Sequence, residues 1–227
     1  MNKILYRLKV QLYKIEKHLI GKIDTRTDLI NYLIKKNNFK SYLEIGVGYG
    51  YNFKNVHCKI KHGCDPYFSK KDGIYCNFIK YNMTSDLMFE QMSADIKYDI
   101  IFIDGLHEGN QVLRDIYNSL NHLNSNGFIL IHDSLPPSAS VASFPRGEAI
   151  IWYGTVYKAY PVLKENNIDF SIIDMDCGIG IIKGTEIGKF FPTIASSKSF
   201  QEIFESEYNY KKEFNVIKRR FYNIKFI

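Results

Sequence analysis

Apolar residues recur along the chain with two periods, one typical of strands and one typical of helices. Short apolar runs predict strands over residues 41–45, 60–65, 76–82, 98–103, 128–131, 170–175 and 178–182. Between several of them, apolar residues three or four positions apart predict helices, most clearly over 108–123, which residues 124–127 end. A further helix is predicted from about 152 to 165. The run 98–103 is almost continuously apolar, as in a strand covered by helices on both faces. This alternation predicts an α/β fold with a mostly parallel, doubly wound sheet.

The two ends of the chain fall outside this alternation. Residues 1–20 place apolar side chains at roughly helical spacing among lysines and arginines. We expect an amphipathic helix there that packs against the domain or a second copy of the chain, or, alternatively, lies on a membrane surface. A second helix is predicted to begin near Asp24 or Thr25, which could cap it. The predicted organisation is N-terminal helices over 1–38, one domain over 39–184, and a helical or irregular extension of that domain over 185–227.

Composition narrows the class of protein without defining its function. The chain has 227 residues, 45% hydrophobic and 24% charged, which is typical of one globular α/β domain with additions at its ends. The net charge of +6 comes mainly from basic residues at both ends, and we expect no nucleic-acid partner. Four cysteines show no paired spacing, and no apolar run reaches the ~18 residues of a membrane span, so a reduced cytoplasmic setting is predicted.

A glycine-rich turn follows the first strand of the domain and predicts a cofactor site. Gly46, Gly48 and Gly50 are spaced two apart, and glycine lets the backbone turn sharply and approach a ligand. The third glycine of a dinucleotide fingerprint would fall at position 51, which is Tyr51. Glu44 adds a carboxylate that would repel a pyrophosphate but attract an ammonium group. The turn therefore favours S-adenosylmethionine over a nicotinamide dinucleotide.

Polar residues after the next two strands complete the predicted cofactor site. Asp65 ends the second strand, where a carboxylate can accept hydrogen bonds from both ribose hydroxyls of an adenosine. Thr84 and Ser85 follow the third strand and would lie beside the adenine. The structural alternatives are a turn aspartate before Pro66 and a helix cap at Thr84–Ser85.

A second group of polar residues follows the fourth and fifth strands. Asp104 and Asp133 end neighbouring strands and could share one hard divalent cation, with His132 as a further candidate ligand. His107 lies one turn beyond Asp104 and could remove a proton from a substrate hydroxyl. The alternative is that both aspartates cap helices and that His107 is a structural histidine.

These motifs resemble a known family. Residues 42–50 resemble motif I of class I S-adenosylmethionine-dependent methyltransferases. The segments Phe102–His107, Leu113–Asp115 and Gly127–Asp133 are similar to small-molecule O-methyltransferases related to macrocin O-methyltransferase, and the likeness runs from about 40 to 183. It implies a seven-stranded Rossmann-like sheet with an antiparallel last strand, and a histidine base at His107. It further implies a divalent metal in many members, here Mg²⁺ or Mn²⁺.

The predicted reaction is methyl transfer to a hydroxyl of a small polar acceptor such as a sugar or glycan-pathway metabolite, as the resemblance implies. Asp104 would then contact the cofactor or orient the acceptor, and residues 134–152 would form much of the acceptor pocket, with Arg146 as a partner for an anionic group. His132 stands where some metal-dependent relatives carry an acid, so the ligand set of a metal is altered or the metal is absent. The alternatives are N-methylation of a small amine or phosphoramidate-like group, and a non-catalytic module that binds membranes. The first helix would also fit a homodimer.

Overall fold

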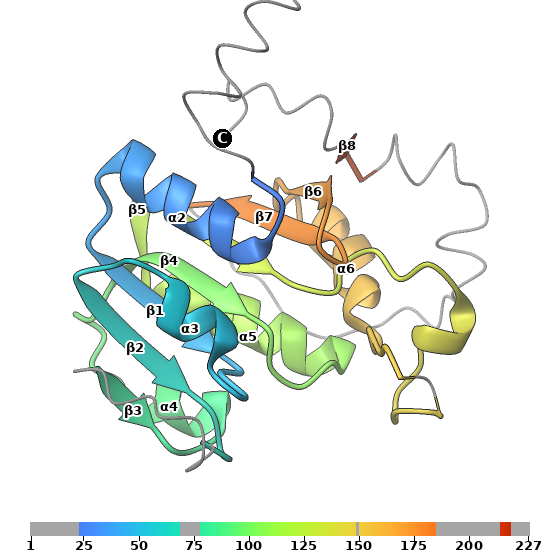
Figure 1. Cartoon of the computed structure of the whole chain (residues 1–227), viewed down its shortest axis with the longest axis horizontal. Coiled ribbons are helices and arrows are strands. Elements are labelled where there is room, and N and C mark those ends of the chain that lie inside the picture. Colours follow the sequence, from blue (N-terminus) through green and yellow to red (C-terminus); the bar gives the residue numbers. More distant parts are fainter. Residues whose placement is uncertain (1–22, 69–77, 149, 185–213, 219–227) are drawn as a thin grey trace, which may run out of the picture.

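One mixed sheet organises the chain in the computed structural model, which describes residues 23–68, 78–148, 150–184 and 214–218. Its strands follow the order β3-β2-β1-β4-β5-β7-β6-β8 (Figure 1). Their bounds are β1 Ser41–Ile45, β2 Ile60–Cys64, β3 Ile79–Tyr81, β4 Tyr98–Ile103, β5 Leu123–Ile131, β6 Ser171–Asp174, β7 Ile179–Lys183 and β8 Val216–Lys218. The strands β1 to β5 are parallel, whereas β7 runs antiparallel to both β5 and β6.

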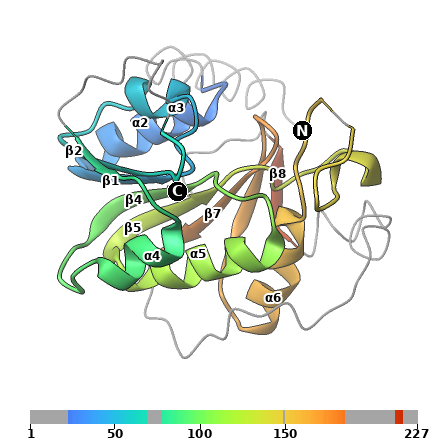
Figure 2. The same ribbon diagram turned by 90° about the horizontal axis from the view of Figure 1, so that it is seen from below.

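Helices cover both faces of this sheet, as Figure 2 shows. Their bounds are α2 Arg26–Asn37, α3 Tyr51–Asn55, α4 Ser85–Gln91, α5 Gly109–Asn121 and α6 Ala159–Glu165. Successive residues of a strand pack into two separate hydrophobic cores, one on each face of the sheet. Leu43 and Ile101 pack with α4, α5 and α6, whereas Tyr42 and Phe102 pack with α2 and α3. Because both faces are covered, β4 is buried along almost its whole length, as its apolar run predicted.

The register of the sheet brings the ends of four parallel strands to one edge. Ile45 pairs with Cys64 on one side and with Ile103 on the other, and Ile103 pairs with Ile131. The residues that follow these strand ends are therefore neighbours in space, although they are far apart in the sequence. This edge contains every predicted site residue that follows β1, β2, β4 and β5.

Side-chain hydrogen bonds cap the first turns of α2, α4 and α5. Thr25 caps α2 in a capping box with Asp28, and Thr84 caps α4. Glu108 caps α5 by accepting hydrogen bonds from two backbone N–H groups of the first turn. The predicted starts of these helices are confirmed, and Thr84 has the capping role that was its structural alternative.

Three boundaries differ from the prediction. The sheet has eight strands rather than seven in the described residues, because β8 pairs with β6 from beyond the predicted domain. Residues 124–127, predicted to end a helix, belong to β5 instead. There Gly127 lies so close to the backbone of Asp99 that a Cβ on Gly127 would be 2.7 Å from the Asp99 carbonyl oxygen. The helix predicted from 152 begins as a 3-10 turn at Val156, after Gly154 turns the backbone with φ 62°.

The predictions for residues 1–20 and for most of 185–227 lie outside the described residues. Within the described ranges, no helix combines the length and apolar character needed to cross a membrane.

Candidate active site

The glycine turn is held in place by the end of the neighbouring strand β2. Gly46, Gly48 and Gly50 all have positive φ, at 83°, 53° and 74°. The N–H of Gly46 donates to the carbonyl of Cys64, and the N–H of Gly48 donates to Oδ2 of Asp65 at 2.8 Å. The other oxygen of Asp65 accepts from the N–H of Tyr67 at 2.7 Å. Asp65 thus orders the turn, and each of its oxygens keeps a lone pair for a ligand.

Glu44 lies buried beneath the turn. Its carboxyl accepts from the hydroxyl of Tyr42 at 2.5 Å and from the amide of Asn52 at 2.9 Å. Burial raises the pKa of Glu44 to about 8, although both hydrogen bonds act to lower it. The carboxyl is therefore largely neutral at pH 7 and would ionise if a cation came beside it. Sequence patterns gave no signal for Tyr42 or Asn52 as its partners.

The predicted adenine-side residues contact α5. Ser85 donates from its hydroxyl to Oδ1 of Asp115 at 2.6 Å and accepts from the amide of Gln111 at 3.2 Å. The other oxygen of Asp115 is buried and has no hydrogen-bond partner among the described residues. Burial raises the pKa of Asp115 to about 7.

His107 lies between the two aspartates predicted to work with it. Its Nδ1 is 3.3 Å from Asp133 and 3.1 Å from the carbonyl oxygen of Trp152, and its Nε2 is 3.6 Å from Asp104. The imidazole stacks on the Trp152 ring with centroids 4.8 Å apart. Burial alone would lower the pKa of His107, but the nearby carboxylates of Asp104 and Asp133 outweigh it and raise that pKa.

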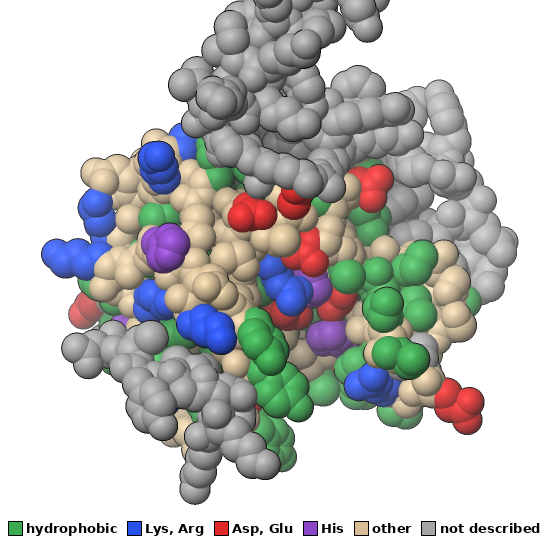
Figure 3. All heavy atoms as spheres, viewed as in Figure 1, with side chains coloured by type: hydrophobic (Ala, Val, Ile, Leu, Met, Phe, Trp, Pro, Cys, Tyr) green, Lys and Arg blue, Asp and Glu red, His purple; other side chains and the backbone are tan. Residues whose placement is uncertain are grey.

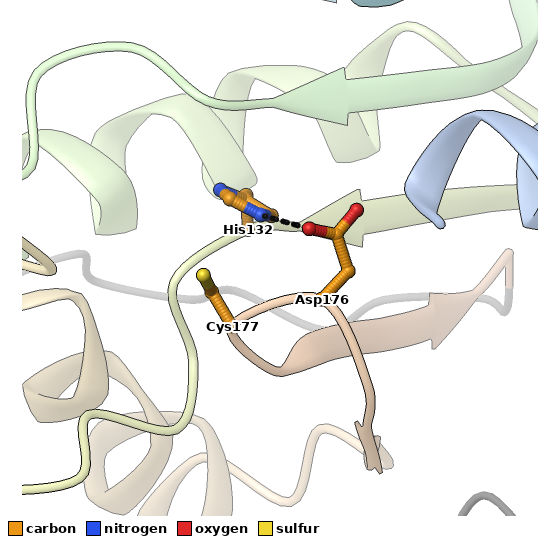
Figure 4. A group of neighbouring side chains, drawn as sticks. All are labelled: His132, Asp176 and Cys177. Carbon is orange, nitrogen blue, oxygen red and sulfur yellow. Dashed lines mark ion pairs between the residues drawn. The ribbon is translucent and has the colours of Figure 1, made fainter. Parts of the chain in front are cut away.

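His132 bridges the same two carboxylates from the other side. Its Nδ1 lies 3.1 Å from Asp104 and 3.2 Å from Asp133, and its Nε2 lies 3.7 Å from Asp176 (Figure 4). Burial would lower the pKa of His132, but Asp104 together with the other two carboxylates raises it well above its usual range. The pKa of Asp104 shifts in the opposite direction. Burial would raise its pKa, but His132, His107 and Arg26 hold it well below the usual range.

Sequence reasoning missed two residues of this cluster, Arg26 and Asp176. The guanidinium Nη1 of Arg26 lies 3.5 Å from Oδ2 of Asp104, and the backbone N–H of Arg26 donates to Asp176 at 2.7 Å. Figure 3 shows basic, acidic and histidine side chains gathered at the middle of this face. Arg26 follows a helix cap and Asp176 lies in a strand turn, and neither position shows a pattern that indicates chemistry.

Two groups in the described residues have ligand atoms within 4.8 Å of one another, as in a metal site. They are Asp104, His107 and Asp133, and His132, Asp176 and Cys177. The predicted ligands Asp104, Asp133 and His132 do meet. However, a hard divalent cation prefers oxygen ligands, and here an imidazole nitrogen lies between the two carboxylates while a guanidinium lies beside Asp104. Arranged in this way, the residues do not fit Mg²⁺ or Mn²⁺.

Comparison with known proteins agrees with this fold. Residues 43–134 match the family model described as a methyltransferase domain, and this span contains the glycine turn, Asp65, Asp104, His107 and Asp133. Together with the sheet order, this match defines the class of protein. The chain contains a methyltransferase domain, built on a Rossmann-like sheet.

Several solved structures share this fold at low sequence identity. A methyltransferase of Podospora anserina bound to S-adenosylhomocysteine is 15% identical with a TM-score of 0.55, over 71% of this chain and 78% of that one. A putative caffeoyl-CoA O-methyltransferase from Staphylococcus aureus is 20% identical with a TM-score of 0.53, over 80% and 98%. A sugar N-methyltransferase from a Streptoalloteichus species is 10% identical with a TM-score of 0.52, over 78% and 93%. No curated protein sequence matches the chain.

Proposed function

We propose that the chain transfers the methyl group of S-adenosylmethionine to a hydroxyl of a small polar acceptor, such as a sugar or another metabolite of polysaccharide biosynthesis. The observation that supports this proposal is the position of His107. Its Nδ1 faces the Trp152 carbonyl and Asp133, so Nδ1 carries the proton and Nε2 is left as the basic nitrogen. The Nε2 atom is 3.6 Å from Asp104, too far for a direct hydrogen bond, and the imidazole is partly exposed. An acceptor hydroxyl can therefore reach it.

The cofactor would bind over the glycine turn. A Cβ added to Gly48 would meet nothing within 4 Å, so the turn faces open space on that side. The adenosine would lie between Asp65, which would accept from the ribose hydroxyls, and Thr84–Ser85 beside the adenine. The ammonium group at the other end would approach Glu44. With these contacts, the sulfonium methyl would point toward the ends of β4 and β5, where Asp104 and His107 lie.

Methyl transfer needs one bond to form while another breaks. The acceptor oxygen attacks the methyl carbon in line, the carbon–sulfur bond breaks, and the electron pair stays on sulfur, which leaves a neutral thioether. The proton of the acceptor hydroxyl passes to Nε2 of His107. Asp104 and Asp133 hold the imidazole between them, so catalysis consists of positioning and deprotonation.

The acceptor would bind against the segment 134–152. Trp152 stacks on His107 and also lies against Phe144, with ring centroids 6.0 Å apart. Aromatic faces of this kind suit the apolar face of a sugar ring. Arg146, whose guanidinium donates to the carbonyl of Ile150, would pair with an anionic group of the acceptor. We also expect the enzyme to act in the cytoplasm.

The decisive experiment is His107→Ala, assayed for methyl transfer to a panel of sugars and nucleotide sugars and for S-adenosylmethionine binding by calorimetry. We expect turnover to fall about 10²–10⁴-fold while cofactor affinity stays unchanged, since a general base contributes on that order. His57→Ala, at an exposed histidine, is the matched control. Near-normal turnover of His107→Ala would refute the base and favour N-methylation of a small amine or phosphoramidate-like group, which needs no strong base.

Residues 1–20 bear on two further parts of the proposal, a homodimer and contact with a membrane surface. Sedimentation with anionic vesicles, with and without residues 1–20, tests the membrane contact, and the mass of each form in solution tests the dimer. A chain that stays in the supernatant in both forms would exclude the membrane-binding module as an alternative function.

A further inference from the structure

Arg26 and His132 bring two nitrogen donors to the carboxylates of Asp104 and Asp133. We propose that these two side chains take the place of a divalent cation at the ends of β4 and β5, so that the enzyme works without added metal. Arg26 is then a positioning residue that keeps Asp104 aligned with His107. Only the activity part of this inference rests on the proposed methyl transfer, because the cation-binding part concerns the cluster alone.

The imidazole of His132 lies where a bridging cation would have to lie. A divalent cation shared by two carboxylates sits about 2.0–2.6 Å from each oxygen. Nδ1 of His132 is instead 3.1 Å from Oδ1 of Asp104 and 3.2 Å from Oδ2 of Asp133, both of which are hydrogen-bond distances. The Nη1 atom of Arg26 lies 2.9 Å from the same Nδ1 atom, so the imidazole and the guanidinium together fill the place between the two carboxylates without an ion.

Arg26 engages the other oxygen of Asp104. Its Nη1 is 3.5 Å from Oδ2, so the two oxygens of Asp104 face a guanidinium and an imidazole. A guanidinium stays positively charged at every physiological pH and repels a metal cation that approaches the same carboxylate.

The backbone fixes Arg26 at this place. It is the first residue of α2 and lies within the capping box that Thr25 and Asp28 form. Its N–H donates to Oδ2 of Asp176 at 2.7 Å, which ties the start of α2 to the turn between β6 and β7. The guanidinium therefore reaches Asp104 from a backbone position that is held by two separate contacts.

The guanidinium of Arg26 and the imidazole of His132 offset two of the three carboxylate charges of the cluster without an ion and leave His107 free to be neutral. Each of three carboxylates lies within 4.0 Å of a nitrogen of the Arg26 guanidinium or of the His107 or His132 imidazole. These carboxylates belong to Asp104, Asp133 and Asp176. Without the guanidinium, Oδ2 of Asp104 would lose its ion pair, and the carboxylate that faces His107 could rotate.

The test measures Mn²⁺ binding to the full-length chain by electron paramagnetic resonance. We expect no stoichiometric binding to the wild type. The double variant Arg26→Ala/His132→Asp removes the guanidinium and supplies a third carboxylate, and we expect its Mn²⁺ affinity to rise about tenfold or more, the scale on which partners around a metal act. Adding Asp104→Asn to the double variant should abolish that binding. Arg114→Ala, which removes an ion pair with Asp86 elsewhere on the fold, is the matched control and should bind no Mn²⁺.

Two outcomes of this binding experiment would overturn the inference. One is stoichiometric Mn²⁺ binding to the wild type that Asp104→Asn abolishes. The other is a folded double variant, checked by circular dichroism, that binds no more Mn²⁺ than the wild type, because the two nitrogen donors would then not be what keeps a cation out.

Activity provides a separate readout once an acceptor is known. Turnover of the wild type should be insensitive to EDTA, and Arg26→Ala should lower turnover without changing S-adenosylmethionine affinity, with partial rescue in Arg26→Lys. A loss of wild-type turnover in EDTA that Mn²⁺ restores would overturn the inference. If no acceptor is methylated by any form of the enzyme, the proposed function fails, and the Mn²⁺ experiment still decides the inference.

Discussion

The first glycine of the turn should be far more sensitive to substitution than the second. A Cβ on Gly46 would overlap the backbone of Asp104 and lie 2.5 Å from Cα of Gly105, whereas a Cβ on Gly48 would meet nothing within 4 Å. Both residues have positive φ, at 83° and 53°. Gly46→Ala and Gly48→Ala therefore share the backbone cost but differ in the clash.

The magnitudes follow from these two contributions. A side chain in the left-handed region costs about 1–2 kcal/mol, and this applies to both variants. Overpacking adds about 1–3 kcal/mol for Gly46→Ala alone, because the obstructing atoms are backbone and cannot rotate away. Urea denaturation without cofactor should thus show Gly46→Ala less stable than Gly48→Ala by about 1–3 kcal/mol. Equal stability of the two variants would refute the close approach of β1 and β4 at this turn.

Three further predictions concern buried groups around the site. Burial raises the pKa of Asp115 to about 7, above the ~3.9 of an unfolded chain. The folded state should therefore lose stability as pH rises from about 4 to 7. Urea denaturation at pH 5 and pH 8 should show a smaller stability difference for Asp115→Asn than for the wild type. The pKa of Glu44 is raised to about 8, so binding of the S-adenosylmethionine ammonium group should release a proton at pH 7. Calorimetry in buffers of different ionisation enthalpy measures this proton release, which should be absent in Glu44→Gln. Trp152→Ala should lower turnover about two- to tenfold with unchanged cofactor affinity, since ring stacking contributes ~0.5–1.5 kcal/mol, and unchanged turnover would contradict a role in holding His107.

The fold could be predicted from the sequence wherever the pattern is local. The apolar run 98–103 indicated a buried strand because both faces of β4 are covered, and the capping residues Thr25 and Thr84 marked helix starts because their side chains bond to the adjacent turn. The meeting of Asp104 with Asp133 followed from one rule, that parallel strands end at the same edge. Each of these predictions needs only a short segment or the order of neighbouring strands.

The remaining features depend on contacts between distant segments. Arg26 reaches Asp176, 150 residues away, and His132, 106 residues away. No periodicity in α2 shows that its first side chain will cross the end of the sheet. The eighth strand likewise depends on pairing between β6 and residues 216–218, and a run of three residues is too short for periodicity to indicate.

The positive residues of the cluster resolve a conflict in the proposed role of His107 as the base. A base must be neutral to accept a proton, yet His107 lies between two carboxylates that raise its pKa and favour the protonated form. Arg26 and His132 engage the same carboxylates and share their negative charge, which weakens their hold on a proton at His107. The carboxylates can then orient the imidazole without keeping it permanently protonated. In the proposed mechanism the start of α2 is therefore part of the chemistry, although it lies 81 residues before His107.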